Sequence, residues 1–443
     1  MMHINNAIST GHNLYDIISN SRKLKLNIYE RFFVLSYLLI PLVDSINGYF
    51  LLNNINTPVS IGQSYRFLIT ILLFMLIFRF AKKVDFYKFI SLSIILLTLQ
   101  FGYFFNHSSL NGLFFDISNI IKLLFIIITI ESYKALYKSG KIRNVVIVTI
   151  FKISIFTFPI SILIPKLLGV GFTAYSNGGG YSAFYNANND LNIVLIILLI
   201  FSLELIFQGI RLKKLNAIYL LGFLLIITVT LMVGSKSSMA FSVVSILVYC
   251  LRSIKNNSII KNFNLFVLLS FAVFLLVRVS YLFQNEINGI IERNKYFLNK
   301  SENIIGFLLS GREIFLENAY YAFINSNFII TRLLIGIGSY AKNLELGQLL
   351  NTGTKVIEMD VFDVFFAYGL LGTFIIYSYF IVLFVKAWKI EFVYKYLYIS
   401  VFVFSTIVGH VLFSALSGSF LAIICCMFVG NARNKKFERD IKE

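Results

Sequence analysis

Five charged residues in the last third of the chain have types and spacings that suit chemistry on a phosphate-bearing substrate. Arg312 and Arg332 each carry a planar guanidinium, which can hold two phosphate oxygens at once. Glu358, Asp360 and Asp363 supply carboxylates, and a carboxylate can orient or deprotonate an attacking hydroxyl. If the chain is helical after residue 361, Asp360 and Asp363 lie one turn apart and face similar directions. The pattern predicts an anion-binding site with a base beside it.

The same carboxylates admit other roles. We expect Asp360 to be the base, followed by Glu358 and Asp363, but Asp360 could instead cap the helix that follows it. Glu358 and Asp360 could also approach a divalent metal as a pair, although the chemistry requires no metal and no cofactor is expected. The three cysteines and four histidines are scattered without the spacing of a metal site.

A second anion site is predicted at Gly234-Ser235-Lys236-Ser237, where one apolar segment ends and the next begins. Free backbone N–H groups at a helix N-terminus favour anions. Two serine hydroxyls and a lysine at that point would make a phosphate cradle. The alternative is an ordinary serine N-cap beside an interfacial lysine, and the residues alone leave both interpretations open.

These residues belong to a chain whose composition excludes a soluble globular protein. Hydrophobic residues make up 58% and charged residues 14%, and the mean hydropathy is +0.80. Soluble domains are about half apolar and a quarter charged. We therefore predict an all-α polytopic membrane protein with about twelve transmembrane helices. The predicted spans are 32–52, 62–80, 86–105, 112–132, 145–168, 191–209, 216–233, 238–253, 263–283, 362–385, 394–415 and 417–431.

The charges of the connections predict how these spans are oriented. Basic connections lie at 79–88, 131–144, 210–215, 252–262 and 386–395. Connections without Lys or Arg lie between them, at 53–61, 104–112 and 415–418. The positive-inside rule then puts the tails 1–31 and 432–443 in the cytoplasm and leaves 284–361 as one large extracytoplasmic loop. This rule also accounts for the net charge of +18, so no nucleic-acid partner is expected.

Charge inside the predicted spans is costly and therefore marks positions of interest. Asp44 and Arg66 stand in the first two spans and could pair across a short connection. Lys122 stands in the outer half of the fourth span, and Arg278 near the outer end of the ninth. His410, in the middle of the eleventh predicted span, is interpreted as a satisfied core histidine rather than a proton carrier.

Two of the predicted outer connections are long. Residues 169–190 include a glycine triplet and the run Asn186-Ala187-Asn188-Asn189-Asp190, which predicts either a flexible hairpin or a polar lip that contacts sugar hydroxyls. The loop 284–361 is too long for a plain connection. Within it, apolar residues over 303–325 are spaced as in an amphipathic helix, which we expect on the outer membrane face.

The order of these motifs resembles the superfamily of O-antigen and capsular polysaccharide polymerases (Wzy) and O-antigen ligases. A serine-basic-serine turn is followed by Gly311-Arg312, an aromatic helix and Leu334-Ile335-Gly336-Ile337-Gly338. An acidic site and Gly369-Leu370-Leu371-Gly372 at the head of a span come next. The resemblance covers residues 234–372 closely and the whole chain in topology. It rests on the ordered set, since no single motif is specific.

The resemblance implies a transmembrane glycosyltransferase of the C class (GT-C-like) without a nucleotide site. An undecaprenyl-diphosphate-linked oligosaccharide is the donor, a hydroxyl of another glycan attacks its anomeric carbon, and the lipid diphosphate leaves with inversion. The implied catalytic residues are Asp360, Glu358, Asp363 and Arg312. The implied diphosphate-binding residues are Lys236, Ser235, Ser237, Arg312, Arg332, Arg66 and Arg278.

The chain departs from the pattern of its relatives at two positions. Lys236 stands where they often have Arg, and Glu358 stands where ligases have His, which favours a polymerase. A ligase that moves finished glycan to another acceptor, a lipid-linked oligosaccharide flippase or transporter, and a non-enzymatic scaffold are the alternatives. Membrane lipid, chain-length-regulator proteins and flippase proteins are the implied partners. The implied location is the bacterial cytoplasmic membrane, with multiple passes.

Overall fold

The chain is all-α apart from one short hairpin. The computed structural model describes residues 25–55, 60–107, 110–175, 179–212, 216–254, 284–300, 306, 309–326, 329–386, 388 and 391–440. Helices in the first part of the chain are α3 (Ile28–Leu52), α4 (Ile61–Phe80), α5 (Lys83–His107), α6 (Leu110–Lys138), α7 (Val145–Leu167), α8 (Asn188–Arg211), α9 (Ala217–Val233) and α10 (Lys236–Ile254). Those of the second part are α12 (Gln284–Lys300), α14 (Arg312–Ile324), α15 (Ile329–Ile335), α16 (Ser339–Leu349), α17 (Asp360–Lys386), α18 (Phe392–Ile407) and α19 (Ala415–Asp440). Strands β1 (Phe172–Thr173) and β2 (Tyr181–Ala183) pair antiparallel.

Six of the described helices, α3, α4, α6, α7, α8 and α17, are long and apolar enough to cross a membrane. Shorter apolar helices are α9, α18 and the stretch 415–429 of α19. Every predicted span except the ninth falls on a helix. The ninth, 263–283, and the predicted site residue Arg278 within it lie outside the described residues.

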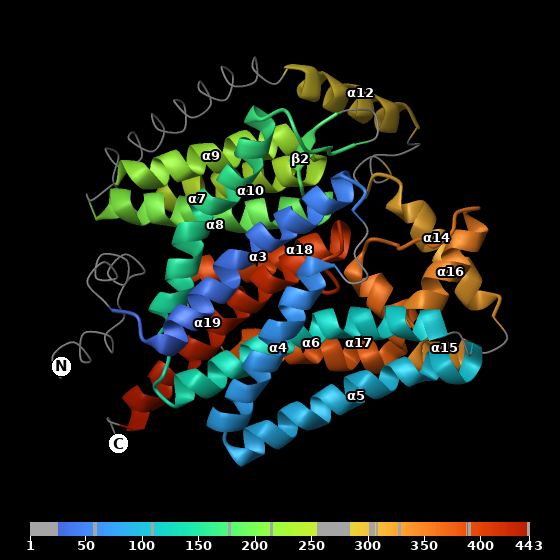
Figure 1. The fold of residues 1–443 in the computed structure, drawn as a ribbon, viewed down its shortest axis with the longest axis horizontal. Coiled ribbons are helices and arrows are strands. Elements are labelled where there is room, and N and C mark those ends of the chain that lie inside the picture. Colours follow the sequence, from blue (N-terminus) through green and yellow to red (C-terminus); the bar gives the residue numbers. More distant parts are fainter. Residues whose placement is uncertain are drawn as a thin grey trace.

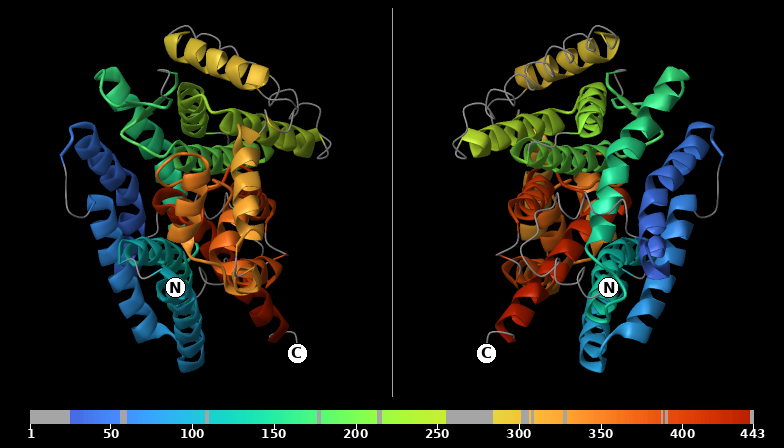
Figure 2. Two further views of the ribbon diagram at one scale, coloured as in Figure 1. Left: turned by 90° about the vertical axis from the view of Figure 1, so that its right-hand side faces the viewer. Right: turned by 90° about the vertical axis from the view of Figure 1, so that its left-hand side faces the viewer.

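The helices form a bundle, and α14, α15 and α16 form a separate group at one end of it, which we call the outer group. The start of α3 and the last turns of α19 lie at the left in Figure 1, whereas α14, α15 and α16 lie at the right. Figure 2 shows α12 as a further layer over α9 and α10. At the bundle's centre α8 is buried on nearly every side from Leu191 to Gly209, as expected for a helix that is apolar all round. The outer group packs against α17 and α6 of this apolar bundle.

A capping box stabilises the N-terminus of α3. The Asn27 side chain accepts a hydrogen bond from the Glu30 N–H, and the Glu30 carboxylate accepts one from the Asn27 N–H, both at 3.0 Å. The buried Glu30 also pairs with Arg143 at 2.7 Å, which ties α3 to the connection before α7.

Two predicted helices have different limits in the structure. The predicted span 394–415 is wrong at its end, because α18 stops at Ile407 and residues 408–414 form a turn before α19. The helix expected over 303–325 is interrupted before Arg312, where α14 begins, because Ser310 and Gly311 both take positive φ angles. The break at 408–414 lies within a mostly apolar run, so the hydropathy pattern did not predict it.

Two glycines join the outer helices to α17 by direct backbone contact. Gly369 interrupts α17 with φ 64° and ψ −168°, and a Cβ on it would lie 2.4 Å from the carbonyl carbon of Leu334. A Cβ on Gly336 would lie 2.2 Å from the carbonyl oxygen of Ala367, which accepts a hydrogen bond from the Gly338 N–H at 2.8 Å. The absence of side chains at Gly336 and Gly369 thus lets the backbone between α15 and α16 pack directly against the backbone of α17.

Candidate active site

A polar cavity of about 830 Å³ lies among the helices beneath the outer group. Residues from α3, α4, α6, α8 and α10 line one part of it, and residues from α12, α14, α16 and α17 and the turn 408–414 line another. The connections before α8, α10, α14 and α17 also contribute, the last of them through Lys355, Val356 and Glu358. Its basic residues are Arg66, Lys122, Lys236, Arg293, Arg312, Lys342 and Lys355. Its acidic residues are Asp44, Asp190, Glu358 and Asp363. The excess of basic over acidic side chains suits an anionic ligand.

The turn between α9 and α10 forms one wall of the cavity. α9 ends at Gly234 in the left-handed conformation. The Ser235 hydroxyl accepts a hydrogen bond from the Ser238 N–H at 3.1 Å and lies 2.8 Å from the Ser237 hydroxyl. Ser235 therefore caps α10, while it lines the cavity together with Lys236 and Ser237. The cap and the anion site offered by the sequence are compatible in this geometry.

Basic side chains converge beside this turn. Burial and the charges of Arg293 and Arg312 lower the pKa of Lys236 to about 8, against an opposing effect of Glu313. The Arg293 guanidinium lies over the Tyr175 ring, 3.8 Å from its centroid. Because the two guanidinium groups disfavour the charged form of Lys236, an anion placed among the three side chains would be strongly favoured.

Arg312 is held at the cavity by the break before α14. Ser310 and Gly311 take φ angles of 58° and 85°, so that Arg312 begins the helix with its side chain in the cavity lining. Its guanidinium donates to the Glu358 carboxylate at 3.0 Å, and Lys355 lies 3.6 Å from the other carboxylate oxygen. The buried Nε of Arg312 has no hydrogen-bond partner.

The structure places Asp360, our preferred base, outside the cavity lining. Its buried carboxylate accepts hydrogen bonds from the Ser405 hydroxyl at 2.6 Å and from the backbone N–H groups of His410, Val411 and Leu412 at 3.0, 2.7 and 3.1 Å. The carboxylate therefore caps the turn between α18 and α19. This geometry gives Asp360 a structural task and leaves little room for an attacking hydroxyl.

Asp363 holds the loop that presents Glu358. Its buried carboxylate pairs with Lys342 and accepts hydrogen bonds from the N–H groups of Ile357 and Met359 at 3.3 and 3.2 Å. Between them Glu358 takes a φ of 65° and lines the cavity with its carboxylate partly exposed. Of the three predicted carboxylates, Glu358 is thus the one best placed to meet a substrate.

The other two predicted arginines that the structure describes, Arg66 and Arg332, lie in different places. The expected pair of Asp44 and Arg66 is present as a bidentate contact of 2.6 and 2.8 Å at the cavity. Arg332 instead forms a bidentate pair with Glu345 at 2.6 and 2.9 Å and does not line this cavity. The structure therefore supports Arg66 as a cavity residue and moves Arg332 away from it.

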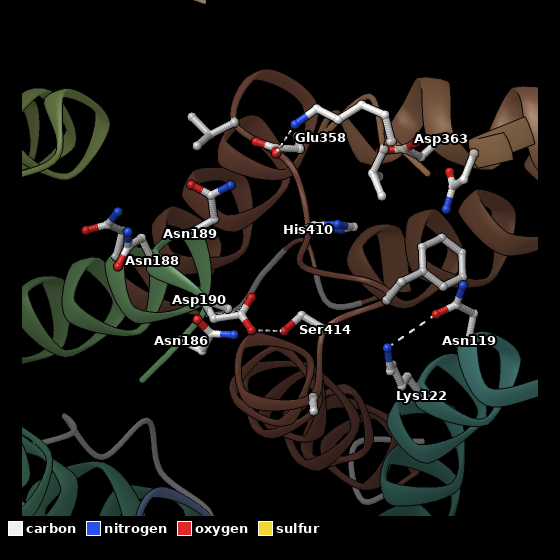
Figure 3. Close-up of a pocket in the computed structure, with 18 of the residues that line it drawn as sticks. Asn119, Lys122, Asn186, Asn188, Asn189, Asp190, Glu358, Asp363, His410 and Ser414 are labelled. Carbon is white, nitrogen blue, oxygen red and sulfur yellow. Dashed lines mark hydrogen bonds and ion pairs between the residues drawn. The ribbon is translucent and has the colours of Figure 1, made fainter. Parts of the chain in front are cut away.

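His410 and Asp190 were not among the predicted catalytic residues, yet both line the cavity. Figure 3 shows His410 between Glu358 and the pair formed by Asp190 and Ser414. His410 takes a φ of 60° in the turn after α18, and its Nδ1 is buried without a partner. Because most of its sequence neighbours are apolar, the sequence predicted a continuous span there and not a turn at a cavity. The adjacent Gly409 was the one local sign of a break.

Amide side chains cover much of the remaining surface. The predicted lip lines the cavity through Asn186, Asn188 and Asn189 (Figure 3). Deeper in, Asn192 and Asn343 are almost fully buried, and the Oδ1 atom of each has no hydrogen-bond partner. Buried amide oxygens without partners suit the hydroxyl donors of a sugar.

The described residues contain no group of three or more metal-ligating side chains that could hold an ion. The predicted pair of Glu358 and Asp360 is divided, because Glu358 faces Arg312 while Asp360 faces the backbone of the turn 408–414. The basic side chains of the cavity are the groups available to balance charge on a ligand.

Residues 287–433 match the family model described as O-antigen ligase like membrane protein. The match confirms the resemblance to the O-antigen ligase and polymerase superfamily. It covers Arg312, Glu358, Asp363 and His410, and so about half of the cavity's walls come from the matched segment. The match supports a glycan-processing function, and the six helices long and apolar enough to cross a membrane support a multi-pass membrane protein. No curated protein and no solved structure matches the chain.

Proposed function

We propose that the chain is a polysaccharide polymerase. It joins undecaprenyl-diphosphate-linked oligosaccharide units, of an O-antigen, capsule or exopolysaccharide, on the outer face of the bacterial cytoplasmic membrane. The observation that carries this proposal is the cavity that sets Lys236, Arg293 and Arg312 near the partly exposed Glu358. The family match supports the glycan-processing class.

The basic group of Lys236, Arg293 and Arg312 is proposed to bind the diphosphate. When the bond from the anomeric carbon to the phosphate oxygen breaks, negative charge grows on the leaving diphosphate. Cations that are already in place stabilise this charge more in the transition state than in the ground state. The N-terminus of α10 adds backbone N–H groups of the same polarity. Lys236 contributes a point charge and Arg312 a fork with an unpartnered Nε.

Glu358 is proposed to accept the proton of the attacking hydroxyl. Its carboxylate is bound to Arg312 at 3.0 Å. An arriving diphosphate competes for that guanidinium and so releases Glu358 toward the acceptor. The hydroxyl oxygen then attacks the anomeric carbon, its proton passes to Glu358, and the lipid diphosphate departs. One direct displacement inverts the anomeric configuration.

We also propose the twelve-span topology with both tails in the cytoplasm and a GT-C-like arrangement. In support, the start of α3 and the end of α19 lie at the end of the bundle opposite to α14, α15 and α16 (Figure 1). The segment 284–361 would then face the outside, as the polymerase reaction requires. Chain-length-regulator and flippase proteins are the expected partners.

The test combines gene deletion with complementation and gel analysis of surface glycan. Deletion should abolish the ladder of chain lengths while single lipid-linked units remain. Arg312→Ala and Glu358→Gln should fail to restore the ladder at normal protein levels, with chain extension in vitro lowered by about a hundredfold or more. Arg332→Ala is the matched control: it removes another arginine of the same outer segment, one bound to Glu345 away from the cavity, and should restore the ladder.

Three outcomes would redirect the proposal. Full-length glycan that accumulates on its lipid carrier without reaching a final acceptor would identify a ligase. Units trapped on the cytoplasmic face would identify a flippase. Normal ladders from both Arg312→Ala and Glu358→Gln would show that the cavity is not the site of transfer.

A further inference from the structure

Lys122 is a lining cation of the cavity that forms no ion pair with a carboxylate of the described residues. It lies twelve residues after the start of α6 at Leu110, roughly 18 Å along the helix at 1.5 Å per residue. Among the described residues its ammonium bonds to the Asn119 amide oxygen, one turn earlier, at 3.2 Å (Figure 3). Arg66 and Lys342, by contrast, are each in contact with an aspartate.

Asp44 and Asp190, which line the same cavity, have other hydrogen-bond partners. Asp44 gives both oxygens to Arg66. Asp190 accepts hydrogen bonds from Ser414 and, at 3.2 Å, from Ser417. An ammonium has three N–H donors, so Lys122 keeps two for a group in the cavity. A ligand anion that reached Lys122 would therefore meet two N–H donors and would lower the cost of a charge within an apolar span.

This position is separate from the proposed diphosphate site. Lys236 interacts electrostatically with Arg293, Arg312 and Glu313. Lys122 interacts electrostatically with Asp190 and Arg66 instead. The cavity therefore contains two basic positions with different neighbours. Three converging cations match a diphosphate, while one ammonium beside amide groups matches a single negative charge.

We propose that Lys122 and Asn119 form a subsite for a carboxylate carried by a sugar of the glycan. The inference rests on the proposed function and adds that the glycan contains a sugar acid. The ammonium supplies the charge, and the Asn119 amide N–H groups can donate to the second carboxylate oxygen. Buried Asn192, whose Oδ1 is without a partner in the same cavity, suits a hydroxyl of such a sugar.

The experiment measures binding of a matched pair of probes to the full-length protein in nanodiscs. One probe is the oligosaccharide released by mild acid from the lipid carrier of the deletion strain. The other is the same oligosaccharide after its carboxyl groups have been reduced to alcohols. The wild type should bind the acidic probe at least tenfold more tightly, and Lys122→Met should bind both probes equally. Lys122→Arg, which keeps the charge, should retain part of the preference.

Two controls separate the subsite from other effects. Lys355→Met, another lining lysine but one in contact with Glu358, should retain the preference for the acidic probe. Inorganic pyrophosphate should bind Lys122→Met within about twofold of the wild type, which also shows that the variant is folded. If Lys122→Met loses pyrophosphate binding instead, Lys122 belongs to the diphosphate site and the proposal is overturned.

A released oligosaccharide that contains no carboxyl group, or a wild type that binds both probes equally, would also overturn it. Either result leaves the polymerase proposal standing if Arg312→Ala still abolishes the ladder. The converse result is a normal ladder from Arg312→Ala while the preference for the acidic probe still depends on Lys122. That result would contradict the proposed polymerase site and support the carboxylate subsite.

Discussion

The cavity is bounded by two helix-to-helix turns that are stabilised in opposite ways. The turn between α9 and α10 satisfies itself locally, since Gly234 ends one helix and Ser235 caps the next. The turn between α18 and α19 depends on Asp360, about fifty residues earlier, for three of its backbone N–H groups. A turn that lines a cavity can therefore be stabilised by residues adjacent in sequence or by a side chain distant in sequence.

The distant arrangement links two parts of the site. A Cβ on Gly409 would lie 2.0 Å from the carbonyl oxygen of Glu358, so the turn 408–414 packs directly on the backbone of the proposed base. Asp360 holds that turn, and Asp363 holds the loop on the other side of Glu358. A change at either aspartate should therefore displace Glu358.

Removal of the Asp360 carboxylate should produce the largest effect on stability. Asp360→Ala leaves three buried N–H groups and the Ser405 hydroxyl without their acceptor, a loss on the order of 3 kcal/mol or more. The thermal unfolding midpoint in detergent should fall clearly, and Asp360→Asn, which keeps one acceptor oxygen, should fall less. An unchanged midpoint together with a lost ladder would restore Asp360 as the base predicted from sequence.

A smaller effect, on binding and not on folding, is expected at the local turn. Because the pKa of Lys236 is lowered to about 8, its ammonium loses its proton as the pH rises through that value. Pyrophosphate affinity should therefore weaken by about tenfold between pH 7 and pH 9, as measured by titration calorimetry. Lys236→Arg stays charged over this range, so the ratio of the two dissociation constants removes the probe's own titration. A ratio that does not change with pH would remove Lys236 from the diphosphate site.

The smallest effect is expected for the serine cap itself. Ser235→Ala removes one acceptor at the start of α10 and should cost about 1 kcal/mol, seen as a slight fall of the unfolding midpoint with the ladder retained. A fall as large as that of Asp360→Ala would show that both turns depend equally on a single side chain, and the contrast between them would fail.

Sequence reasoning succeeded where the determining residues are neighbours. Long apolar runs located the helices, and the serine-lysine turn was found from four adjacent residues. It could not foresee the break at 408–414, because Val408, Val411 and Leu412 are as apolar as the span before them. The partner of Arg332 was equally hidden, since a guanidinium matched to Glu345 and one kept for a phosphate look alike in sequence.

The backbone contact between Gly336 and Gly369 limits how the helices around the cavity can move apart. Where two backbones touch without side chains between them, neither can slide or rotate past the other without first moving apart. We therefore expect the segment 329–349 to move together with the stretch of α17 around Gly369. If the proposed function holds, a lipid carrier is expected to enter the cavity through another wall than the one between these helices.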